Sequence, residues 1–306
     1  MPYAPLELAR LKHWWSHHSV ARSALAIKYV AECDSSNAQL YRSPSQHHTL
    51  LVAERQTHGR GQFERVWRSQ AGDLIFSLGL SLPLDAIPAL SIRVGLALAQ
   101  TCTQNGWPVQ LKWPNDLIGQ TASHKGKLAG ILVQANPSNH SGHSSHSSPE
   151  SRSTMRWVVI GVGLNIAPRL DEPSMNTDLA PSAFAPIGLA QIDPTWHART
   201  LALGARETLL MQLVDAILCA IETAHALPDT SLAQRWNQYD LWQQHTVQWA
   251  EHGTADEAAP SEYGTALGIN AWGEYRIQPA IIDPAAAAPI VTLNSGQIRA
   301  YHPITE

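Results

Sequence analysis

The chain has 306 residues, a length that fits one large domain plus a smaller one. Hydrophobic residues make up 44% and charged residues 15%, which supports a sizeable core and excludes a mostly disordered chain. The 21 Lys and Arg are outnumbered by 25 Asp and Glu, and a net charge of −4 favours neither a nucleic-acid partner nor an anionic membrane surface. Any site for an anion must therefore be a local cluster of cations.

The cysteines and the apolar runs indicate the compartment. Cys33, Cys102 and Cys219 are far apart, odd in number and form no CxxC pair, which argues against a disulfide framework and a structural zinc site. The first 20 residues lack the continuous apolar stretch of a signal peptide, and no run approaches the roughly 18 apolar residues of a membrane span. We expect a soluble, cytoplasmic protein.

The first third of the chain predicts alternating helices and strands. Leu8, Leu11 and Trp15 have helical spacing, and the polar run at residues 34–37 is typical of a helix N-terminus. A longer helix is predicted over residues 88–105, where Gly106 ends it. Apolar runs of strand length are found at residues 26–32, 49–53 and 74–82.

A second strand-rich block follows. Residues 109–113 lead into a turn at Pro114-Asn115-Asp116, and residues 127–134 and 156–161 are apolar runs of strand length. Between the last two, residues 136–153 are rich in Ser, His, Asn and Pro, a composition that predicts a flexible surface insertion. The insertion contains three histidines, but with no Cys or carboxylate in register a solvated loop is favoured over a metal site. They are His140, His143 and His146.

The last third predicts helices and then a small β-barrel. Asp193-Pro194 is typical of a helix start, and an apolar stripe from Leu203 to Ile221 continues the helix to about Ala224. A second helix is predicted over residues 231–240. Short strands are predicted at 246–249, 263–269, 274–277, 290–293 and 297–301. We therefore expect two domains, residues 1–243 and 244–306.

The densest group of candidate binding residues lies at positions 56–67. Gly59 and Gly61 flank Arg60, and Arg65 follows, so backbone amides and guanidinium groups could surround an anion. The segment is not a P-loop, because GxxxxGK[ST] does not occur. A solvated basic turn is an equally good interpretation of this loop alone, and a single copy in an acidic chain disfavours an RGG-type nucleic-acid segment.

Two further segments carry candidate residues. Lys112 ends one predicted strand and Lys127 begins another, and with Asp116 they could form an anion site that includes a base. The alternative is solvated lysines at strand ends. Gly161 and Gly163 alternate along a strand, which allows a ligand or another chain to approach one face closely, although the pattern lacks the third glycine of a dinucleotide fingerprint.

Taken together and in this order, the segments resemble the biotin–protein ligases. The family's Lys-Trp-Pro-Asn-Asp and Lys-Leu-Ala-Gly-Ile-Leu strings match residues 112–116 and 127–132 without change. Its Asp-Ser-Thr-Asn helix start, Gly-Arg-Gly-Arg-x-Gly-Arg-x-Trp loop and Gly-x-Gly-x-Asn strand match residues 34–37, 59–67 and 161–165. The resemblance covers about residue 26 to the end. Ser36 stands in place of Thr, Gln62 in place of Arg, and Glu64 in place of Gly.

The resemblance implies a fold and a reaction. The fold is α+β, a mixed sheet with helices like that of class II aminoacyl-tRNA synthetases and lipoate ligases, followed by an SH3-like β-barrel. The reaction joins biotin to AMP from ATP, with Mg²⁺ on the phosphates, and then transfers biotin to a lysine of the biotin carboxyl carrier protein of acetyl-CoA carboxylase. With only 33 residues before Asp34, no DNA-binding domain is expected. The oligomeric state stays open, a homodimer being one option.

The resemblance also implies a role for each candidate residue. Asp116 takes the proton of the acceptor lysine, although a turn residue that caps the Pro114 corner is the alternative. The catalytic set is Arg60, Lys112, Asp116 and Lys127. The biotin-binding set is Ser35, Ser36, Asn37, Gln56, Gly59, Arg60, Gly61, Gln62, Lys127 and Gly130. The set that binds ATP and the adenylate is Arg60, Arg65, Trp67, Lys112 and Asn165, with Asn165 also on the Mg²⁺ side.

Two alternatives remain beside the biotin ligase. One is a lipoate ligase of the same superfamily, which the unaltered strings at residues 112–116 and 127–132 disfavour. The other is a non-catalytic protein that binds biotin or a nucleotide, which the altered loop at Gln62 and Glu64 keeps open. Release of pyrophosphate with biotin, with lipoate or with neither separates the three.

Overall fold

The structure is a computed structural model, and it describes residues 3–21, 24–136, 155–169, 184–196, 204–224, 226–250, 263–280 and 289–300. The predicted insertion lies outside these ranges except for Asn136, and so do its three histidines. Among the described residues, no helix is long and apolar enough to cross a membrane.

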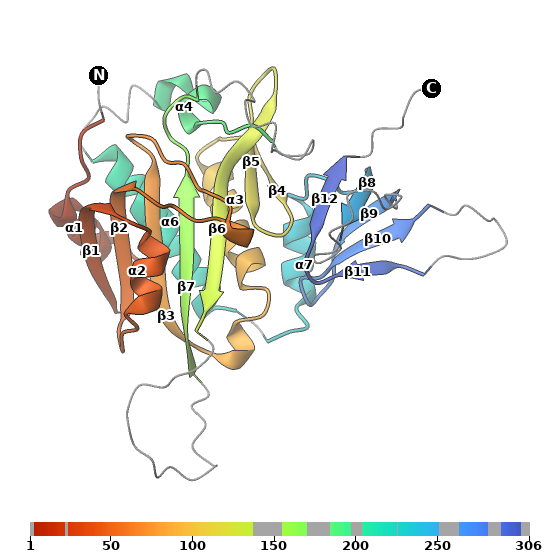
Figure 1. Ribbon diagram of the computed structural model, residues 1–306, viewed down its shortest axis with the longest axis horizontal. Helices are drawn as coiled ribbons and strands as arrows, with labels where there is room; N and C mark the ends of the chain where they lie inside the picture. The colour runs from red at the N-terminus through yellow and green to blue at the C-terminus, as the bar shows by residue number, and fades with distance from the viewer. Residues whose placement is uncertain are drawn as a thin grey trace, which may run out of the picture.

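The larger part of the structure is a seven-stranded sheet in the order β1-β2-β3-β7-β6-β5-β4 (Figure 1). The β1–β2 pair is parallel and every other neighbouring pair is antiparallel, so the sheet is mixed, as the resemblance implies. Its strands are β1 (Leu25–Cys33), β2 (His48–Gln56), β3 (Leu74–Pro83), β4 (Val109–Lys112), β5 (Asp116–Gln120), β6 (Lys125–Ala135) and β7 (Met155–Leu164).

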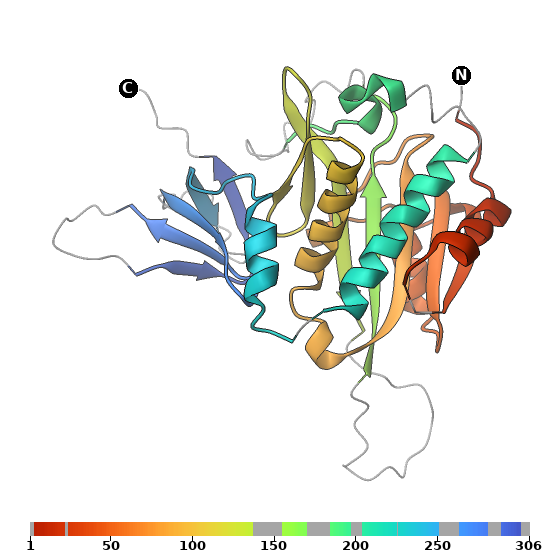
Figure 2. The same ribbon diagram turned by 180° about the vertical axis from the view of Figure 1, so that it is seen from behind.

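Helices cover both faces of this sheet. The long helices α3 and α6 pack side by side over the rear face, and α2 lies on the front face against β3 and β7 (Figures 1 and 2). The described helices are α1 (Leu8–His18), α2 (Ser36–Arg42), α3 (Leu90–Gln104), α4 (Leu189–Ile192), α6 (Ala205–Glu222) and α7 (Thr230–Asn237), with the 3-10 turns η1 (Gln62–Glu64) and η2 (Leu84–Ala86).

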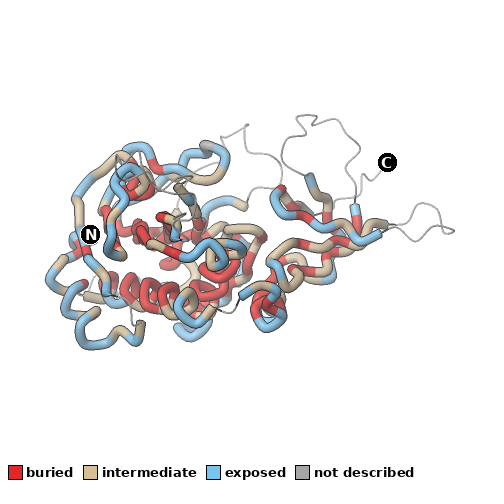
Figure 3. The backbone as a smooth tube through the Cα atoms, turned by 90° about the horizontal axis from the view of Figure 1, so that it is seen from below, coloured by how far each residue is buried: buried red, intermediate tan, exposed pale blue. Residues whose placement is uncertain are grey.

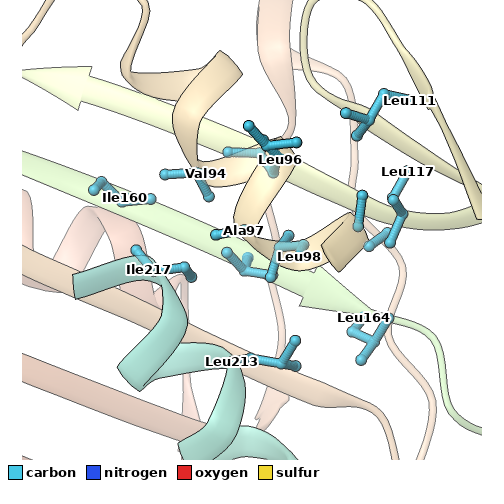
Figure 4. Packing of buried hydrophobic residues seen from close by; sticks show 14 of the residues in the cluster. Val94, Leu96, Ala97, Leu98, Leu111, Leu117, Ile160, Leu164, Leu213 and Ile217 are labelled. Atoms are coloured by element: carbon cyan, nitrogen blue, oxygen red, sulfur yellow. The ribbon is translucent and has the colours of Figure 1, made fainter. Parts of the chain in front are cut away.

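The core lies between the sheet and its rear helices. Val94 and Leu98 of α3 pack with Leu213 and Ile217 of α6 over Ile160 of β7 (Figure 4). Each is at most 2% exposed, and burying such a side chain contributes roughly 1.5–3 kcal/mol. The buried residues run through the centre of the larger part and its rear helices (Figure 3), so the sheet is a firm base for the side chains on its front face.

A separate five-stranded antiparallel sheet follows, in the order β11-β10-β9-β8-β12. Trp113, at the end of β4, donates from Nε1 to the carbonyl of Gly273 at 3.2 Å, and Tyr275 donates to Asp240 Oδ2 at 2.7 Å. The two sheets are therefore joined next to the Trp-Pro-Asn-Asp turn. The strands are β8 (Thr246–Ala250), β9 (Tyr263–Ile269), β10 (Tyr275–Pro279), β11 (Val291–Leu293) and β12 (Gln297–Ala300).

The order of strands and helices predicted from the sequence is confirmed, with two corrections. Asp193 does cap a helical turn, because its Oδ1 accepts the Thr195 and Trp196 amides at 3.0 and 3.1 Å. The apolar stripe from Leu210 to Ile221 belongs to a different helix, since α6 begins at Ala205 behind Gly204, whose φ of 91° is left-handed. Leu203 lies outside the described residues. The sequence analysis also missed two short elements, the helix α4 and the strand β5, which it had treated as the end of a turn.

Candidate functional site

A buried polar cluster lies on the front face where α2 begins. Ser35 is the N-cap, and its Oγ accepts the Ala38 amide at 3.4 Å. Gln56 Oε1, at the end of β2, accepts both the amide and the hydroxyl of Ser36, at 2.7 and 3.1 Å. The Ser36 hydroxyl also lies 2.7 Å from that of Ser77, a fully buried residue of β3. The helix start thus brings three predicted biotin ligands together.

Asn37 completes this cluster. Its Oδ1 accepts from the Ser77 hydroxyl at 2.6 Å, and its Nδ2 donates to Leu132 O at 3.2 Å and Gln134 Oε1 at 3.1 Å. A Cβ at Gly161 would overlap the Asn37 amide, so the first glycine of the Gly-x-Gly strand makes room for this side chain. The four polar side chains hold one another in fixed orientations.

The Arg/Gly loop closes on itself beside the cluster. Gly61 N donates to Arg65 O at 2.7 Å and Trp67 N donates to Gly59 O at 2.9 Å, which makes the loop a small hairpin around η1. Arg60 and Arg65 are exposed at its rim. A cavity of about 380 Å³ separates the loop from β6, lined by Arg60, Gly61, Gln62, Phe63, Leu132 and Gln134.

Trp67 lies on glycines of the neighbouring strands. A Cβ at Gly163 would overlap its indole, and a Cβ at Gly130 would be 2.9 Å from its Cζ3. The second glycine of the Gly-x-Gly strand therefore accommodates Trp67, as the first accommodates Asn37. Lys127 Nζ lies 5.5 Å from the centroid of the same ring, within the range of a cation–π contact.

Lys127 and Asp116 form the charged centre of the site. Lys127 Nζ lies 2.7 Å from Asp116 Oδ1, and the two side chains are 30% and 17% exposed. A β-bulge creates this arrangement, because Leu117 pairs with Ala129 while Ile118 pairs with Lys127, which leaves Leu128 as the extra residue. As a result the Lys127 ammonium lies on the side of Gly130, where a Cβ would be 3.5 Å from Nζ.

Lys112 and Asn165, the remaining two predicted residues, differ from each other in where they lie. Lys112 ends β4 and pairs with Asp116 in the β4–β5 ladder, and Asn115 Nδ2 fastens the intervening turn to Ile131 O at 2.8 Å. Asn165 is 3% exposed, and protein atoms occupy both ends of its amide. Lys112 is therefore beside the charged centre, whereas Asn165 lies beneath it.

Two titratable groups at the edge of the site have shifted pKa values. The Ser35 amide and then the Arg42 guanidinium hold the pKa of the Asp34 carboxyl below its usual value, so that carboxyl stays ionised. Burial, followed by the nearby carboxylates of Asp34 and Glu32, raises the pKa of the Cys33 thiol to about 11. Cys33 is thus a neutral thiol at physiological pH and does not act as a nucleophile here.

Sequence reasoning missed several residues that the site depends on. Ser77 and Gln134 orient Asn37, and Asp73 and Arg169 lie behind Asn165. A signal did exist for Ser77, one of two serines on a largely apolar strand. Gln134, Asp73 and Arg169 had no comparable local signal, since only the sheet register and the turn after β7 bring them to the site.

The site lacks a ready-made metal centre among its described residues. No group of three or more His, Cys, Asp or Glu side chains in the described part of the chain could hold a metal ion. Mg²⁺ usually binds through only one or two carboxylates together with substrate phosphates. Mg²⁺ therefore stays a sequence-based prediction, as an ion that ATP brings with it.

The sequence is similar to those of known biotin and lipoate ligases. Residues 30–147 match the model of the Biotin/lipoate A/B protein ligase family. The chain is 33% identical over 175 residues to the biotin--[acetyl-CoA-carboxylase] ligase of Mycobacterium tuberculosis. The matched region covers 52% of this chain and 57% of that protein. It is 33% identical over 139 residues to the bifunctional ligase/repressor BirA of Bacillus spizizenii, covering 44% and 38%. The chain thus spans less than two thirds of the length of both relatives.

Solved structures share the fold over nearly the whole chain. The biotin protein ligase of Aquifex aeolicus in complex with biotin and ATP superposes with a TM-score of 0.60 at 20% identity, covering 89% of this chain and 97% of that one. The apo structure of the same ligase gives a TM-score of 0.60 at 18% identity, covering 91% and 100%. The α+β architecture with a separate C-terminal antiparallel sheet is therefore the fold of biotin protein ligases.

Proposed function

Because residues 30–147 match the model of the Biotin/lipoate A/B protein ligase family, we propose that the chain activates biotin with ATP to biotinyl-AMP and transfers biotin to a lysine of a protein. The observation that carries this proposal is the Lys127–Asp116 pair, 2.7 Å apart, beside Trp67 at the base of the loop that carries Arg60. In this proposal the Lys127 cation serves the activation of biotin, and the Asp116 carboxylate serves its transfer to the acceptor lysine.

The first half-reaction brings two anions together. A carboxylate oxygen of biotin attacks the α-phosphorus of ATP, a P–O bond forms, and the bond to the β-phosphate oxygen breaks to release pyrophosphate. Cations placed where negative charge concentrates lower this barrier. Lys127 is the partly buried cation of the site, Arg60 and Arg65 are exposed on the loop, and Lys112 on β4 pairs with Asp116.

The second half-reaction needs a neutral amine, and a free lysine is almost wholly protonated at neutral pH. A carboxylate takes a proton from the acceptor ammonium, and the neutral nitrogen attacks the carbonyl carbon of biotinyl-AMP. The C–O bond to AMP then breaks, and the second nitrogen proton leaves to the departing phosphate or to water. The proposal gives this role to Asp116. Its Oδ1 contacts Lys127, and a phosphate that attracts the Lys127 ammonium frees that oxygen to accept the proton.

The polar cluster suits the other end of biotin. Hydroxyl and amide groups of Ser35, Ser36, Asn37 and Gln56 offer donors and acceptors of the kind that a cyclic urea requires. Their mutual hydrogen bonds fix these groups before the substrate arrives, which reduces the entropy lost on binding. Mg²⁺ would neutralise phosphate charge when ATP carries it in.

The finer details of the reaction also belong to the proposal. We propose the carboxyl carrier protein of acetyl-CoA carboxylase as the acceptor, supported by the name of the Mycobacterium tuberculosis relative. The two domains meet near residue 243, supported by the change from the seven-stranded to the five-stranded sheet. Three free cysteines support a reducing, cytoplasmic location.

One assay separates this function from its alternatives. Purified protein is incubated with ATP, Mg²⁺ and either biotin or lipoate, and pyrophosphate release is measured. Release with biotin alone supports the proposal, and release with lipoate alone would assign a lipoate ligase. Binding of biotin without release in either case would identify a non-catalytic binding protein.

A further inference from the structure

Three buried polar residues lie in a row behind Lys127, and the proposed chemistry uses none of them directly. Asp73 is 1% exposed, Asn165 is 3% exposed and the Arg169 side chain is 6% exposed. Buried polar and charged groups destabilise a protein unless each finds its partners inside. Their arrangement therefore reflects a defined set of contacts.

Asn165 connects this row to Lys127. Its Nδ2 donates to the Lys127 carbonyl at 3.0 Å, and its Oδ1 accepts from Arg169 Nη2 at 2.7 Å. A guanidinium can only donate, so the atom that faces Arg169 must be the amide oxygen. Arg169 therefore prevents the amide from flipping and keeps its NH₂ group directed at Lys127.

Asp73 in turn fixes Arg169. Its Oδ2 lies 2.5 Å from Arg169 Nη2 and accepts the Gln70 amide at 2.7 Å, and its Oδ1 accepts the Ile166 amide at 2.9 Å. The carboxylate thus joins the segment before β3 to the turn after β7. Arg169 has a defined position because its partner Asp73 is hydrogen-bonded both to the segment before β3 and to the turn after β7.

The contact with Lys127 falls at the bulge in β6. The Lys127 carbonyl accepts from Ile187 N and from Asn165 Nδ2, both at 3.0 Å. A bulge disrupts the ladder locally and re-aims a side chain, so its geometry depends on contacts outside the ladder. Asn165 supplies one such contact.

We propose that Asp73, Arg169 and Asn165 form a positioning relay that fixes the bulge in β6 and so holds the Lys127 ammonium at the reacting phosphate. This inference rests on the proposed function, since it gives Lys127 a substrate to act on. It also gives Asn165 a different role from the phosphate and metal side that the family resemblance implies.

Asn165→Asp separates the two roles of Asn165. The aspartate keeps an acceptor for Arg169, but it removes the donor to the Lys127 carbonyl and sets a second acceptor against it. A positioning role predicts a fall in kcat for pyrophosphate release of about 10- to 100-fold with little change in KM for biotin. A metal ligand would keep its function as a carboxylate, so an unchanged or raised kcat would overturn the relay.

Arg169→Lys tests the relay while Asn165 itself stays unchanged. Arg93→Lys is its matched control. Arg93 lies in another buried ion pair, 3.3 Å from Asp229, with a side chain 7% exposed. Both variants should lose similar thermal stability, while only Arg169→Lys should lower kcat. In a Lys127→Ala background Arg169→Lys should cause no additional loss, because its effect passes through Lys127. A fully additive loss would contradict the relay.

Backbone hydrogen exchange gives a readout that needs no activity. The Ile187 amide, which donates to Lys127 O, should exchange faster in Asn165→Asp and Arg169→Lys and unchanged in Arg93→Lys. Unchanged exchange in the first two variants would overturn the relay. A wild-type protein that releases no pyrophosphate with biotin would instead overturn the proposed function, so the two failures are distinguishable.

Discussion

The polar cluster around α2 and the Arg/Gly loop differ in how complete they are without a ligand. In the cluster Ser36 and Asn37 are 3% and 4% exposed and Ser77 is fully buried, with every side chain hydrogen-bonded. In the loop Phe63 and Val66 are 57% and 73% exposed, and Arg60 and Arg65 face solvent. The two regions are only one strand and a turn apart along the chain.

The difference follows from the groups that each region presents. Neutral hydroxyls and amides can be buried at modest cost if they satisfy one another, so a site for a neutral ring can be formed in advance. Guanidinium groups lose far more hydration free energy than neutral groups when they leave water, so they stay hydrated until an anion replaces the water. We therefore expect biotin recognition to depend on rigid geometry and the contacts to the phosphate to form on binding.

The largest effect is expected at Lys127, which lies where the two regions meet. In Lys127→Ala, pyrophosphate release with biotin should fall about 10²- to 10³-fold, because one preorganised charge facing two anions is removed. Thermal unfolding should change little, since the side chain is 30% exposed. Lys125→Ala, an exposed lysine two residues earlier on β6, is the control. Undiminished release in Lys127→Ala would remove Lys127 from the mechanism.

Asp116→Asn should divide the two half-reactions. The amide keeps the shape of the carboxylate and removes its basicity, so biotinyl-AMP should still form while transfer to the acceptor lysine slows by about 10²-fold. The measurement is single-turnover transfer from preformed adenylate. Asp85→Asn, an exposed carboxylate in η2, should leave transfer unchanged. Normal transfer in Asp116→Asn would mean that Asp116 only shapes the turn.

The sequence predicted the fold wherever local pattern and tertiary structure agree. The apolar runs at residues 74–82 and 127–134 became β3 and β6, and the polar run at 34–37 became the start of α2. The helix boundary at Gly204 was missed because an apolar stripe does not show where the backbone turns left-handed.

The candidate site could be predicted only in part, for a similar reason. Motif residues such as Lys127 and Asp116 are recognisable one by one, but their 2.7 Å contact depends on a bulge that is a property of strand pairing. The two alternating glycines were identified correctly as places of close approach. In the structure, Asn37 and Trp67 approach them from elsewhere in the same chain.

Ser77→Ala removes a buried hydrogen bond from the polar cluster around α2. It leaves Asn37 Oδ1 without its donor in a buried position, which should cost about 1–3 kcal/mol of unfolding free energy. Loss of the Asn37 orientation should also weaken biotin binding roughly tenfold, as titration calorimetry would show. Ser81→Ala, on the same strand, is the control. Unaltered biotin affinity in Ser77→Ala would mean that the cluster supports the fold and not the substrate.

Gln62→Arg changes the exposed loop and has the smallest expected effect. Gln62 lines the cavity between the loop and β6, where the resemblance implies an arginine. A charge-assisted hydrogen bond to the adenylate phosphate is roughly twice as strong as the neutral one that Gln can make. Release of preformed biotinyl-AMP, measured without acceptor, should therefore slow about three- to tenfold, and Glu64→Gly should act in the same direction by removing a negative charge.

The position of the added charge decides this prediction. Gln120→Arg adds the same charge at an exposed position on β5 and should leave the release rate unchanged. If the loop contacts the phosphate only after the adenylate forms, Gln62→Arg should slow release without altering biotin affinity, because biotin alone offers no phosphate. Equal slowing in both variants would point to long-range attraction, which about 0.5 M salt would screen. An unchanged or faster rate in Gln62→Arg would mean that Gln62 does not face the phosphate and that the loop stays open over its ligand.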